Sequence, residues 1–132
     1  DSESSHFVPA MISKLHRAKD GDEVVFWGTG DPKRQQLYVD DLCEAIPILL
    51  EKHERMEPVI VAPEENLSIK EMVSEACSIM KKKVVAKFNQ ELDGQFRKDG
   101  DNSLFKSVVP GFKFTPFEEG LKKTYEWYKN EQ

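Results

Sequence analysis

A histidine and a lysine near the start of the chain carry side chains that could move a proton or neutralise an anion. His6 is a candidate general acid or base, because histidine titrates near neutral pH. Lys14 follows eight residues later, which corresponds to about 12 Å along a helix axis at 1.5 Å per residue. A lone histidine is more often structural or solvated than catalytic, so spacing alone leaves both interpretations of His6 open.

A tryptophan and an arginine flank the stretch Gly28-Thr29-Gly30. A phosphate-binding loop needs several glycines at a junction between a strand and a helix. Here the glycines separate two predicted strands, and the turn sequence Asp31-Pro32 follows, so we predict a hairpin turn instead. Trp27 could fill the core or present its ring to a sugar or base. Arg34 could be a solvated charge or could bind a diphosphate with two parallel hydrogen bonds.

Other common arrangements of catalytic or metal-binding residues are not expected. The sequence has no CxxC or HExxH spacing, which argues against a dedicated metal site. No Ser-His-Asp or Cys-His set can be assembled from local spacing, and we expect neither a glycine-rich dinucleotide turn nor a Tyr-x-x-x-Lys pair. Asp93 lies in the polar stretch "ELDGQFRKDGDN", where the glycine that follows it favours a turn.

The elements that must position these residues are predicted from hydrophobic periodicity. Helices are expected over residues 6–19, 40–53, 67–82, 102–107 and 115–132, and strands over 23–27, 34–39, 57–63 and 83–89. Ser68 with Glu71 forms a capping box, and Thr115 is expected to cap the last helix with Pro116 at its first position. Together the elements predict one α/β domain.

Two prolines constrain the predicted helices. Pro9 is tolerable only in a first turn, so we expect the first helix to begin close to His6. Pro47 conflicts with the apolar pattern around it, because an internal proline removes a hydrogen bond; a bent or restarted helix is expected there.

Composition limits the classes of function. The chain has 132 residues, 39% of them hydrophobic and 33% charged, and a net charge of −5, which is unlike a general nucleic-acid binder. No apolar run is long enough to span a membrane. Cys43 and Cys77 both lie in apolar helical patterns, so we expect two buried thiols in a reducing compartment, the cytoplasm.

Four stretches together carry a family resemblance: "HFVPAMISKLHRAK", "VVFWGTGDPKRQQLYVDDL", "LSIKE" and "DGQFRKDGDNSLFKSVVPGFKFTPFEEGLKKTYEWY". They resemble the C-terminal region of the GDP-L-fucose synthase branch of the extended short-chain dehydrogenase/reductase (NAD-dependent epimerase/dehydratase) family. Trp-Gly-Thr-Gly with Pro-x-Arg is shared in part by other nucleotide-sugar epimerases. "DGQFRK" with "FTPFEEGLKKTYEWY" is more specific to this branch.

The resemblance implies that residues 1–132 form a small substrate-binding domain of an enzyme about twice as long. In that branch an N-terminal Rossmann domain, absent here, binds NADP(H). The complete enzyme converts GDP-4-keto-6-deoxy-D-mannose to GDP-L-fucose by 3,5-epimerisation and NADPH-dependent 4-reduction. The resemblance therefore predicts that this chain alone is inactive.

The resemblance also assigns roles to single residues. His6 matches the acid that acts during epimerisation and lies beside the nicotinamide. Lys14 and Arg34 match cationic contacts of the substrate, suited to the GDP diphosphate. Trp27 matches a residue that lines the sugar-nucleotide pocket, and Asp93 matches an acceptor for substrate hydroxyl groups.

Lys98 is expected to add a charge near the diphosphate. Pro47 departs from the regular helix expected in the family, and residues 1–5 carry no family signature. Two other functions stay open: a different nucleotide-sugar epimerase or dehydratase, and a non-catalytic sugar-nucleotide-binding domain. We expect no nucleic-acid or membrane partner, a homodimer for the full-length enzyme and a monomer for this chain.

Overall fold

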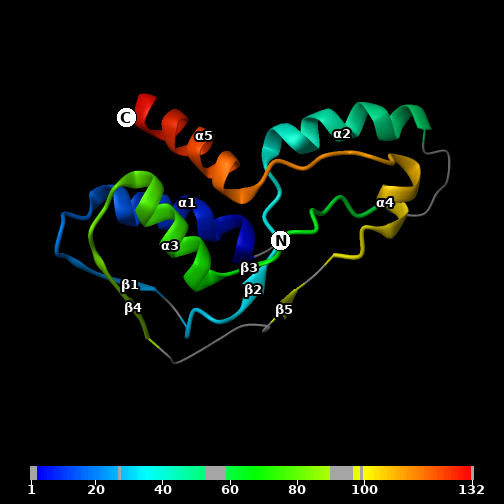
Figure 1. Cartoon of the computed structure of the whole chain (residues 1–132). Helices are drawn as coiled ribbons and strands as arrows, with labels where there is room; N and C mark the ends of the chain where they lie inside the picture. Colours follow the sequence, from blue (N-terminus) through cyan, green and yellow to red (C-terminus); the bar gives the residue numbers. More distant parts are fainter. Residues whose placement is uncertain (1–2, 27, 53–58, 90–96, 99, 132) are drawn as a thin grey trace.

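The chain forms an α/β structure, as the sequence predicts. The computed structural model describes residues 3–26, 28–52, 59–89, 97–98 and 100–131. Its helices are α1 (Glu3–Arg17), α2 (Val39–Lys52), α3 (Ile69–Met80), α4 (Ser103–Val108) and α5 (Phe117–Asn130). Its strands are β1 (Glu23–Phe26), β2 (Lys33–Arg34), β3 (Leu67–Ser68), β4 (Val85–Phe88) and β5 (Arg97–Lys98) (Figure 1).

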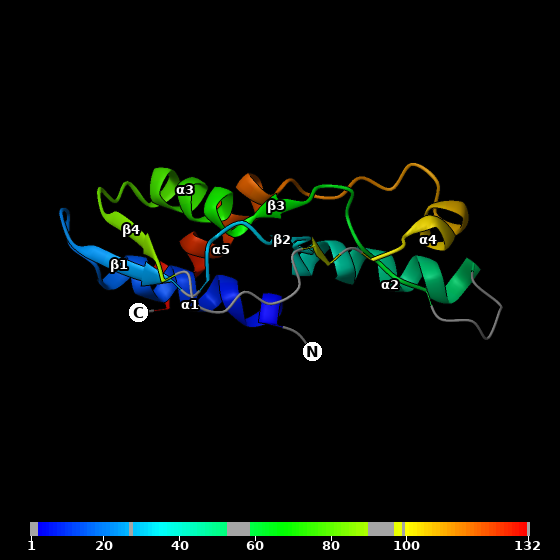
Figure 2. The same cartoon turned by 90° about the horizontal axis from the view of Figure 1, so that it is seen from below.

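The strands form two small sheets. β1 and β4 pair in parallel, with Val24 opposite Ala86. The other sheet has the order β3-β2-β5, in which β2 runs antiparallel to β3 and parallel to β5. In both views this second sheet lies between the α1, α3 and α5 group and the α2 and α4 group (Figures 1 and 2).

Each group of helices has its own hydrophobic core. The larger core joins α1, α3 and α5 to β1 and β4, and its fully buried side chains include Met11, Leu15 and Met72. The smaller core joins α2 to α4 through Ala45 and Phe105, both with 0% exposure. The chain passes back and forth between the two cores. The sheet β3-β2-β5, called the β2 sheet below, therefore lies between the larger core and the smaller core.

Three predictions about strands need correction. Gly28-Thr29-Gly30 is not a hairpin turn, because β1 pairs with β4 and β2 pairs with β3 and β5. Residues 59–63 of the predicted strand 57–63 have no strand partner among the described residues, and residues 57–58 lie outside the described part. Of the predicted strand 34–39 only Arg34 belongs to a strand, β2, and Val39 already belongs to α2. In each case the pairing depends on a distant segment.

The helices follow the sequence more closely. The capping box is confirmed: Ser68 Oγ accepts from Glu71 N at 3.1 Å, and Glu71 Oε1 accepts from Ser68 N at 2.8 Å. The cap of α5 is Pro116 rather than Thr115, one residue later than predicted. Pro9 lies inside α1 and not in its first turn, because α1 begins at Glu3.

The predictions for Pro47 and the two cysteines can also be compared with the structure. Pro47 lies inside α2, which is continuous from Val39 to Lys52, so no restart occurs. The expectation of two buried thiols is wrong for Cys43, which is exposed on α2. Cys77 is half-buried, and burial raises the pKa of its thiol.

Candidate functional site

Arg34 lies at the centre of the β3-β2-β5 sheet. Its side chain is only 7% exposed, and its guanidinium donates from Nη1 to the carbonyl oxygen of Lys33 at 2.7 Å. Across the sheet, Arg34 is in register with Leu67 on β3 and with Lys98 on β5. The fold therefore brings the backbones of two cationic residues predicted to bind substrate, Arg34 and Lys98, onto neighbouring strands.

The segment after β2 is fixed by one side-chain amide. Gln35 donates from Nε2 to the carbonyl oxygen of Pro63 at 2.6 Å, and its Oε1 accepts from Gly100 N at 2.7 Å. A Cβ at Gly100 would lie 2.8 Å from Ile60 Cγ2, so only glycine lets the backbone approach this closely. Gln35 thus fixes the backbone at Gly100, just after β5, the strand that carries Lys98.

The segment before β2 closes the N-terminus of α3. Ile69 N donates to Pro32 O at 3.0 Å, and Lys70 N donates to Gly30 O at 2.9 Å. With the capping box, the N–H groups of residues 68–71 are all satisfied by protein groups. This helix N-terminus therefore has no free donors for a phosphate, in agreement with the rejection of a phosphate loop at these glycines.

Lys14 lies on α1 beside the end of β1. Its Nζ donates to the carbonyl oxygen of Val25 at 2.7 Å and lies 5.1 Å from the centre of the Phe26 ring. An ammonium group has three donors, so this contact leaves capacity for a further acceptor. The contact places the charge next to the chain that leads from β1 into Trp27.

Of three further predicted site residues, only His6 lies within the described part of the chain, and only by its backbone. The backbone of His6 belongs to α1, on the same helix as Lys14, while its side chain lies outside the described part. Trp27 lies outside the described residues, between Phe26 and Gly28. Asp93 also lies outside them, in the segment between β4 and β5.

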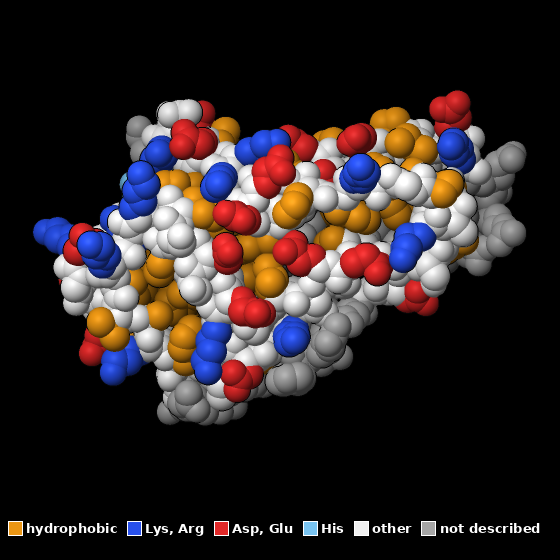
Figure 3. Space-filling view, viewed as in Figure 1, with side chains coloured by type: hydrophobic (Ala, Val, Ile, Leu, Met, Phe, Trp, Pro, Cys, Tyr) orange, Lys and Arg blue, Asp and Glu red, His pale blue; other side chains and the backbone are white. Residues whose placement is uncertain are grey.

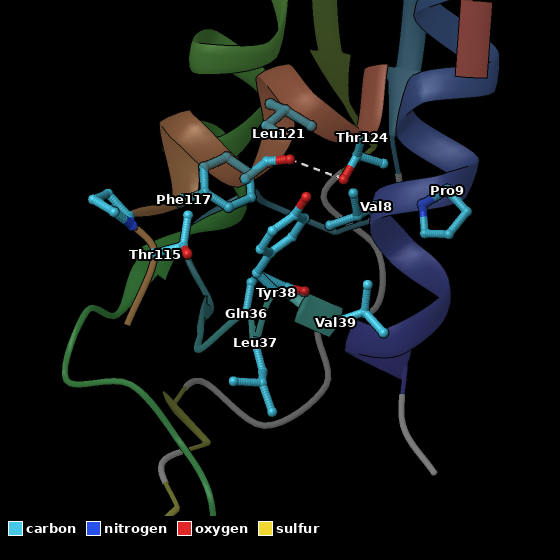
Figure 4. A pocket seen from close by; sticks show the side chains of 12 residues that line it. Val8, Pro9, Gln36, Leu37, Tyr38, Val39, Thr115, Phe117, Leu121 and Thr124 are labelled. Atoms are coloured by element: carbon cyan, nitrogen blue, oxygen red, sulfur yellow. Dashed lines mark hydrogen bonds between the residues drawn. The ribbon is translucent and has the colours of Figure 1, made fainter. Parts of the chain in front are cut away.

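An apolar pocket, which sequence reasoning missed, lies between α1, α5 and the segment before α2. It has a volume of about 330 Å³, and its walls include Val8, Tyr38, Val39, Phe117 and Leu121 (Figure 4). The Gln36 side chain contributes a buried Nε2 with no hydrogen-bond partner among the described residues. No local spacing marked the pocket, because its walls come from three separate segments.

The surroundings of Tyr38 in this pocket disfavour loss of its phenol proton. Burial raises the pKa of Tyr38, and the charge of Asp40 and a hydrogen bond with it act in the same direction. The Lys123 ammonium, 5.9 Å from the centre of the Tyr38 ring, opposes the shift more weakly. Tyr38 is therefore not set up as a base, and its hydroxyl already hydrogen-bonds with Asp40.

One expectation from the sequence needs correction, because Tyr125 and Lys129 do stand at Tyr-x-x-x-Lys spacing on α5. Lys129 Nζ lies 4.9 Å from the centre of the Tyr125 ring, and the Tyr125 hydroxyl lies 3.4 Å from His16 Nδ1. His16 also packs edge-on against Tyr128. These contacts join α5 to α1 through the larger core, so we read the pair as structural.

The face of the molecule seen in Figure 3 shows no single dominant charge. In Figure 3 acidic and basic side chains are interspersed over the visible face. In the part of the chain that the structure describes, no group of three His, Cys, Asp or Glu side chains could hold a metal ion. Among the same residues, no helix is both long and apolar enough to cross a membrane.

Comparison with known proteins confirms the resemblance seen in the motifs. The model of the NAD dependent epimerase/dehydratase family matches residues 1–62. A probable GDP-L-fucose synthase 1 from Oryza sativa subsp. japonica is 39% identical over 96% of this chain. A GDP-L-fucose synthase from Dictyostelium discoideum is 32% identical over 93% of it. The similarity therefore extends over nearly the whole chain.

The solved structures give the same result for the fold. A GDP-L-fucose synthetase from Naegleria fowleri bound to NADP superimposes with a TM-score of 0.85 and 28% identity, over 97% of this chain and 41% of that one. The rice and Dictyostelium proteins are likewise covered only to 39% and 40% of their lengths. The chain thus spans about two fifths of the length of these relatives.

Proposed function

We propose that this chain is the GDP-sugar-binding part of a GDP-L-fucose synthase of the NAD-dependent epimerase/dehydratase family. The complete enzyme would convert GDP-4-keto-6-deoxy-D-mannose to GDP-L-fucose. The similarity to GDP-L-fucose synthases over 96% of the chain carries the proposal. The placement of Arg34 and Lys98 on adjacent strands supports it.

The diphosphate would be bound at the β2 sheet. Arg34 offers a planar fork of donors that matches phosphate oxygens, and its burial lowers the entropy lost on binding. Lys14 and Lys98 would add positive charge from α1 and β5. Trp27 would form a wall of the sugar-nucleotide pocket, and Asp93 would accept hydrogen bonds from substrate hydroxyl groups.

His6 would supply the proton in epimerisation. A 4-ketone acidifies the protons at C3 and C5, so a base can remove each proton and an acid can return it on the other face. Histidine suits the acid role because it titrates near neutral pH. Its place in the first half of α1, on the helix that carries Lys14, would set the acid and the cation at one wall of the site.

The described residues do not fit a dinucleotide by themselves. They offer no glycine-rich turn leading into an open helix N-terminus, since that of α3 is closed by Gly30, Pro32 and its capping box. We therefore assign NADP(H) mainly to polypeptide outside this chain, with His6 as the contact from this side. That cofactor would supply the reducing equivalent for the 4-keto group.

The proposal also covers the location and the oligomeric state of the enzyme. The full-length protein would be a cytoplasmic homodimer, and this chain alone would be a monomer without catalytic activity. Two alternatives make different predictions. Another nucleotide-sugar epimerase would prefer a UDP- or dTDP-sugar. A non-catalytic domain would bind the sugar nucleotide, but no longer form of the protein would turn it over.

The test is NADPH-dependent conversion of GDP-4-keto-6-deoxy-mannose by the complete gene product, with His6→Gln and Arg34→Gln. We expect His6→Gln to lose at least tenfold in epimerisation with little change in GDP-sugar affinity. We expect Arg34→Gln to weaken GDP-sugar binding at least tenfold.

The control is Lys33→Gln, next to Arg34 on the same strand, which should keep near wild-type affinity. Equal affinity for GDP-, UDP- and dTDP-sugars would rule out the assigned substrate. If His6→Gln epimerises at the wild-type rate, His6 is not the acid in epimerisation.

A further inference from the structure

The strand that carries Lys98 is too short for its backbone pairing to fix its place. β5 consists of Arg97 and Lys98, and among the described residues it pairs with β2 alone, in parallel. Parallel pairing is slightly less stable per residue than antiparallel pairing, and strands usually have about five or six residues. Side-chain contacts beyond the strand must therefore help to keep β5 beside Arg34.

Gln35 supplies the first of these contacts. It follows Arg34 directly in the sequence, and its Oε1 accepts from Gly100 N at 2.7 Å, just after β5. Its Nε2 donates to Pro63 O at 2.6 Å. Turning the amide over would bring donor against donor and acceptor against acceptor, so its orientation is set by its partners. The side chain of Gln35 thus continues the pairing of β2 with the chain after β5.

Asn102 makes a matching contact from the chain after β5. Its Nδ2 donates to Ala62 O at 2.7 Å and to Glu64 Oε2 at 2.9 Å. Gln35 and Asn102 therefore bind consecutive carbonyl groups, those of Ala62 and Pro63, and both of these residues are buried. Proline has no N–H and interrupts a regular ladder, so side-chain donors satisfy these carbonyls instead. Residues 62–64 are thus the support on which the chain after β5 is held.

The position of Arg34 does not depend on these two amides. Its side chain is buried and donates from Nη1 to Lys33 O at 2.7 Å. Loss of the Gln35 amide would therefore leave Arg34 in place and release the end of β5. A binding group needs supporting contacts that hold it in the productive geometry. For Lys98, the contact of this kind nearest to β2 is the bond between Gln35 and Gly100.

We propose that Gln35 is a positioning residue for the diphosphate of the substrate. By accepting from Gly100 N, it keeps the backbone of Lys98 on the strand next to Arg34, and Asn102 fixes the chain that follows. The inference rests on the proposed function in that Lys98 and Arg34 bind the diphosphate. Its signature is weaker binding of ligands that carry a diphosphate, with turnover preserved.

Two substitutions of Gln35 in the complete gene product test the role. Gln35→Met keeps the length of the side chain and removes both hydrogen bonds. We expect it to raise KM for the GDP-sugar at least fivefold and to leave kcat within twofold, because the bond acts on binding and not on the reacting carbons. Gln35→Glu keeps an acceptor for Gly100 N and should return KM to within twofold of the wild type.

A matched control separates positioning from a general loss of stability. Thr115→Val also removes a side-chain hydrogen bond, the one to Asp41, but far from β5 in the sequence. It should lower the melting temperature and leave KM for the GDP-sugar unchanged. A rise in KM in Thr115→Val equal to that in Gln35→Met would mean that KM only follows stability, which would overturn the proposal.

A double-mutant cycle with Lys98 tests whether Gln35 acts through that residue. Titration calorimetry with GDP would compare the wild type, Gln35→Met, Lys98→Gln and the double variant. We expect Gln35→Met to weaken GDP binding at least fivefold alone and less than twofold in the Lys98→Gln background, because coupled residues are not additive. Losses that simply multiply would overturn the proposal, as would unchanged affinity in Gln35→Met.

Asn102→Ala keeps the test open if Gln35→Met does not fold. It leaves Gln35 in place, frees the chain after β5 and should raise KM at least threefold; an unchanged KM would overturn the proposal. Titration of the same variants with UDP and dTDP separates the two proposals. A loss in Gln35→Met that appears with UDP, in a protein without preference for GDP, would contradict only the proposed function. A clear GDP preference without coupling between Gln35 and Lys98 would contradict only this inference.

Discussion

The carboxylate of Asp41 accepts two hydrogen bonds from Thr115, 74 residues further along the chain. Thr115 N donates to Oδ2 at 2.6 Å, and Thr115 Oγ1 donates to Oδ1 at 2.7 Å. Asp41 is only 6% exposed and lies in the first turn of α2, whereas Thr115 immediately precedes the cap of α5. This pair therefore connects the two cores.

Asp41→Ala should lower the free energy of unfolding by about 3 kcal/mol, because it leaves two donors of Thr115 without their charged acceptor. Thr115→Val keeps the amide bond and removes only the hydroxyl, so it should cost about 1 kcal/mol. Urea unfolding followed by circular dichroism measures both. Equal losses for the two variants would show that the amide bond to Asp41 contributes nothing.

The capping box of α3 should make stability depend on pH. Hydrogen bonds from the backbone and side chain of Ser68 lower the pKa of Glu71 from its ordinary value of 4.5. A carboxylate with a lowered pKa in the folded state stabilises the protein above its unfolded pKa, and this contribution is lost as pH falls through the folded pKa. Stability should therefore drop below about pH 4.5, and less steeply in Glu71→Gln.

Ser68→Ala should cost about 1 kcal/mol at neutral pH, the usual contribution of a helix cap. Thermal unfolding from pH 3 to 7 of the wild type, Glu71→Gln and Ser68→Ala would test both statements. An identical pH profile for wild type and Glu71→Gln would contradict the assignment.

Gly30 should tolerate substitution less well than Gly21. Both have positive φ, +85° and +93°. A Cβ at Gly30 would lie 2.5 Å from Lys70 Cγ and 2.9 Å from Phe88 Cδ1, whereas one at Gly21 would meet nothing within 4 Å. Gly21→Ala should cost about 1 kcal/mol from backbone strain, and Gly30→Ala about 2 to 4 kcal/mol. Chemical denaturation of the two variants decides; similar losses would mean that Lys70 and Phe88 move aside.

Lys14 should affect both stability and ligand binding. Lys14→Met removes the hydrogen bond to Val25 O and should cost about 1 kcal/mol. It should also weaken GDP binding severalfold by removing a charge, whereas Lys14→Arg should retain most of the affinity. Isothermal titration calorimetry with GDP on folded variants tests this. If Lys14→Met binds GDP with unchanged affinity, Lys14 has only a structural role, its hydrogen bond to Val25 O on β1.

The sequence predicts the local parts of this fold better than the distant ones. The capping box of α3 is correct because its two members are three residues apart and interact with each other. The hairpin at Gly28-Thr29-Gly30 is wrong because its neighbours are distant: Gly28 N donates to Asn89 Oδ1 across 61 residues. Residues 59–63 have the composition of a strand, but a strand also needs a neighbour to pair with.

The candidate site follows the same division. Periodicity placed His6 and Lys14 on one helix, and the structure places them both in α1. The juxtaposition of Arg34 and Lys98 depends on the pairing of β2 with β5, which no local pattern encodes. The pocket around Tyr38 was missed for the same reason, because α1, the segment before α2 and the start of α5 each supply part of its wall.

The interleaved path of the chain between the two cores has a consequence for how the protein assembles. Glu23 on β1 pairs with Val85 on β4, and the segment that carries α2 lies between them in the sequence. The larger core therefore forms only when this intervening segment is closed into a loop. Contacts of such high sequence separation slow folding, because the entropy of closing a long loop must be lost before the contacts form. Neither half of the chain contains a whole core, so a cut between α2 and β3 would release two fragments that must recombine to fold.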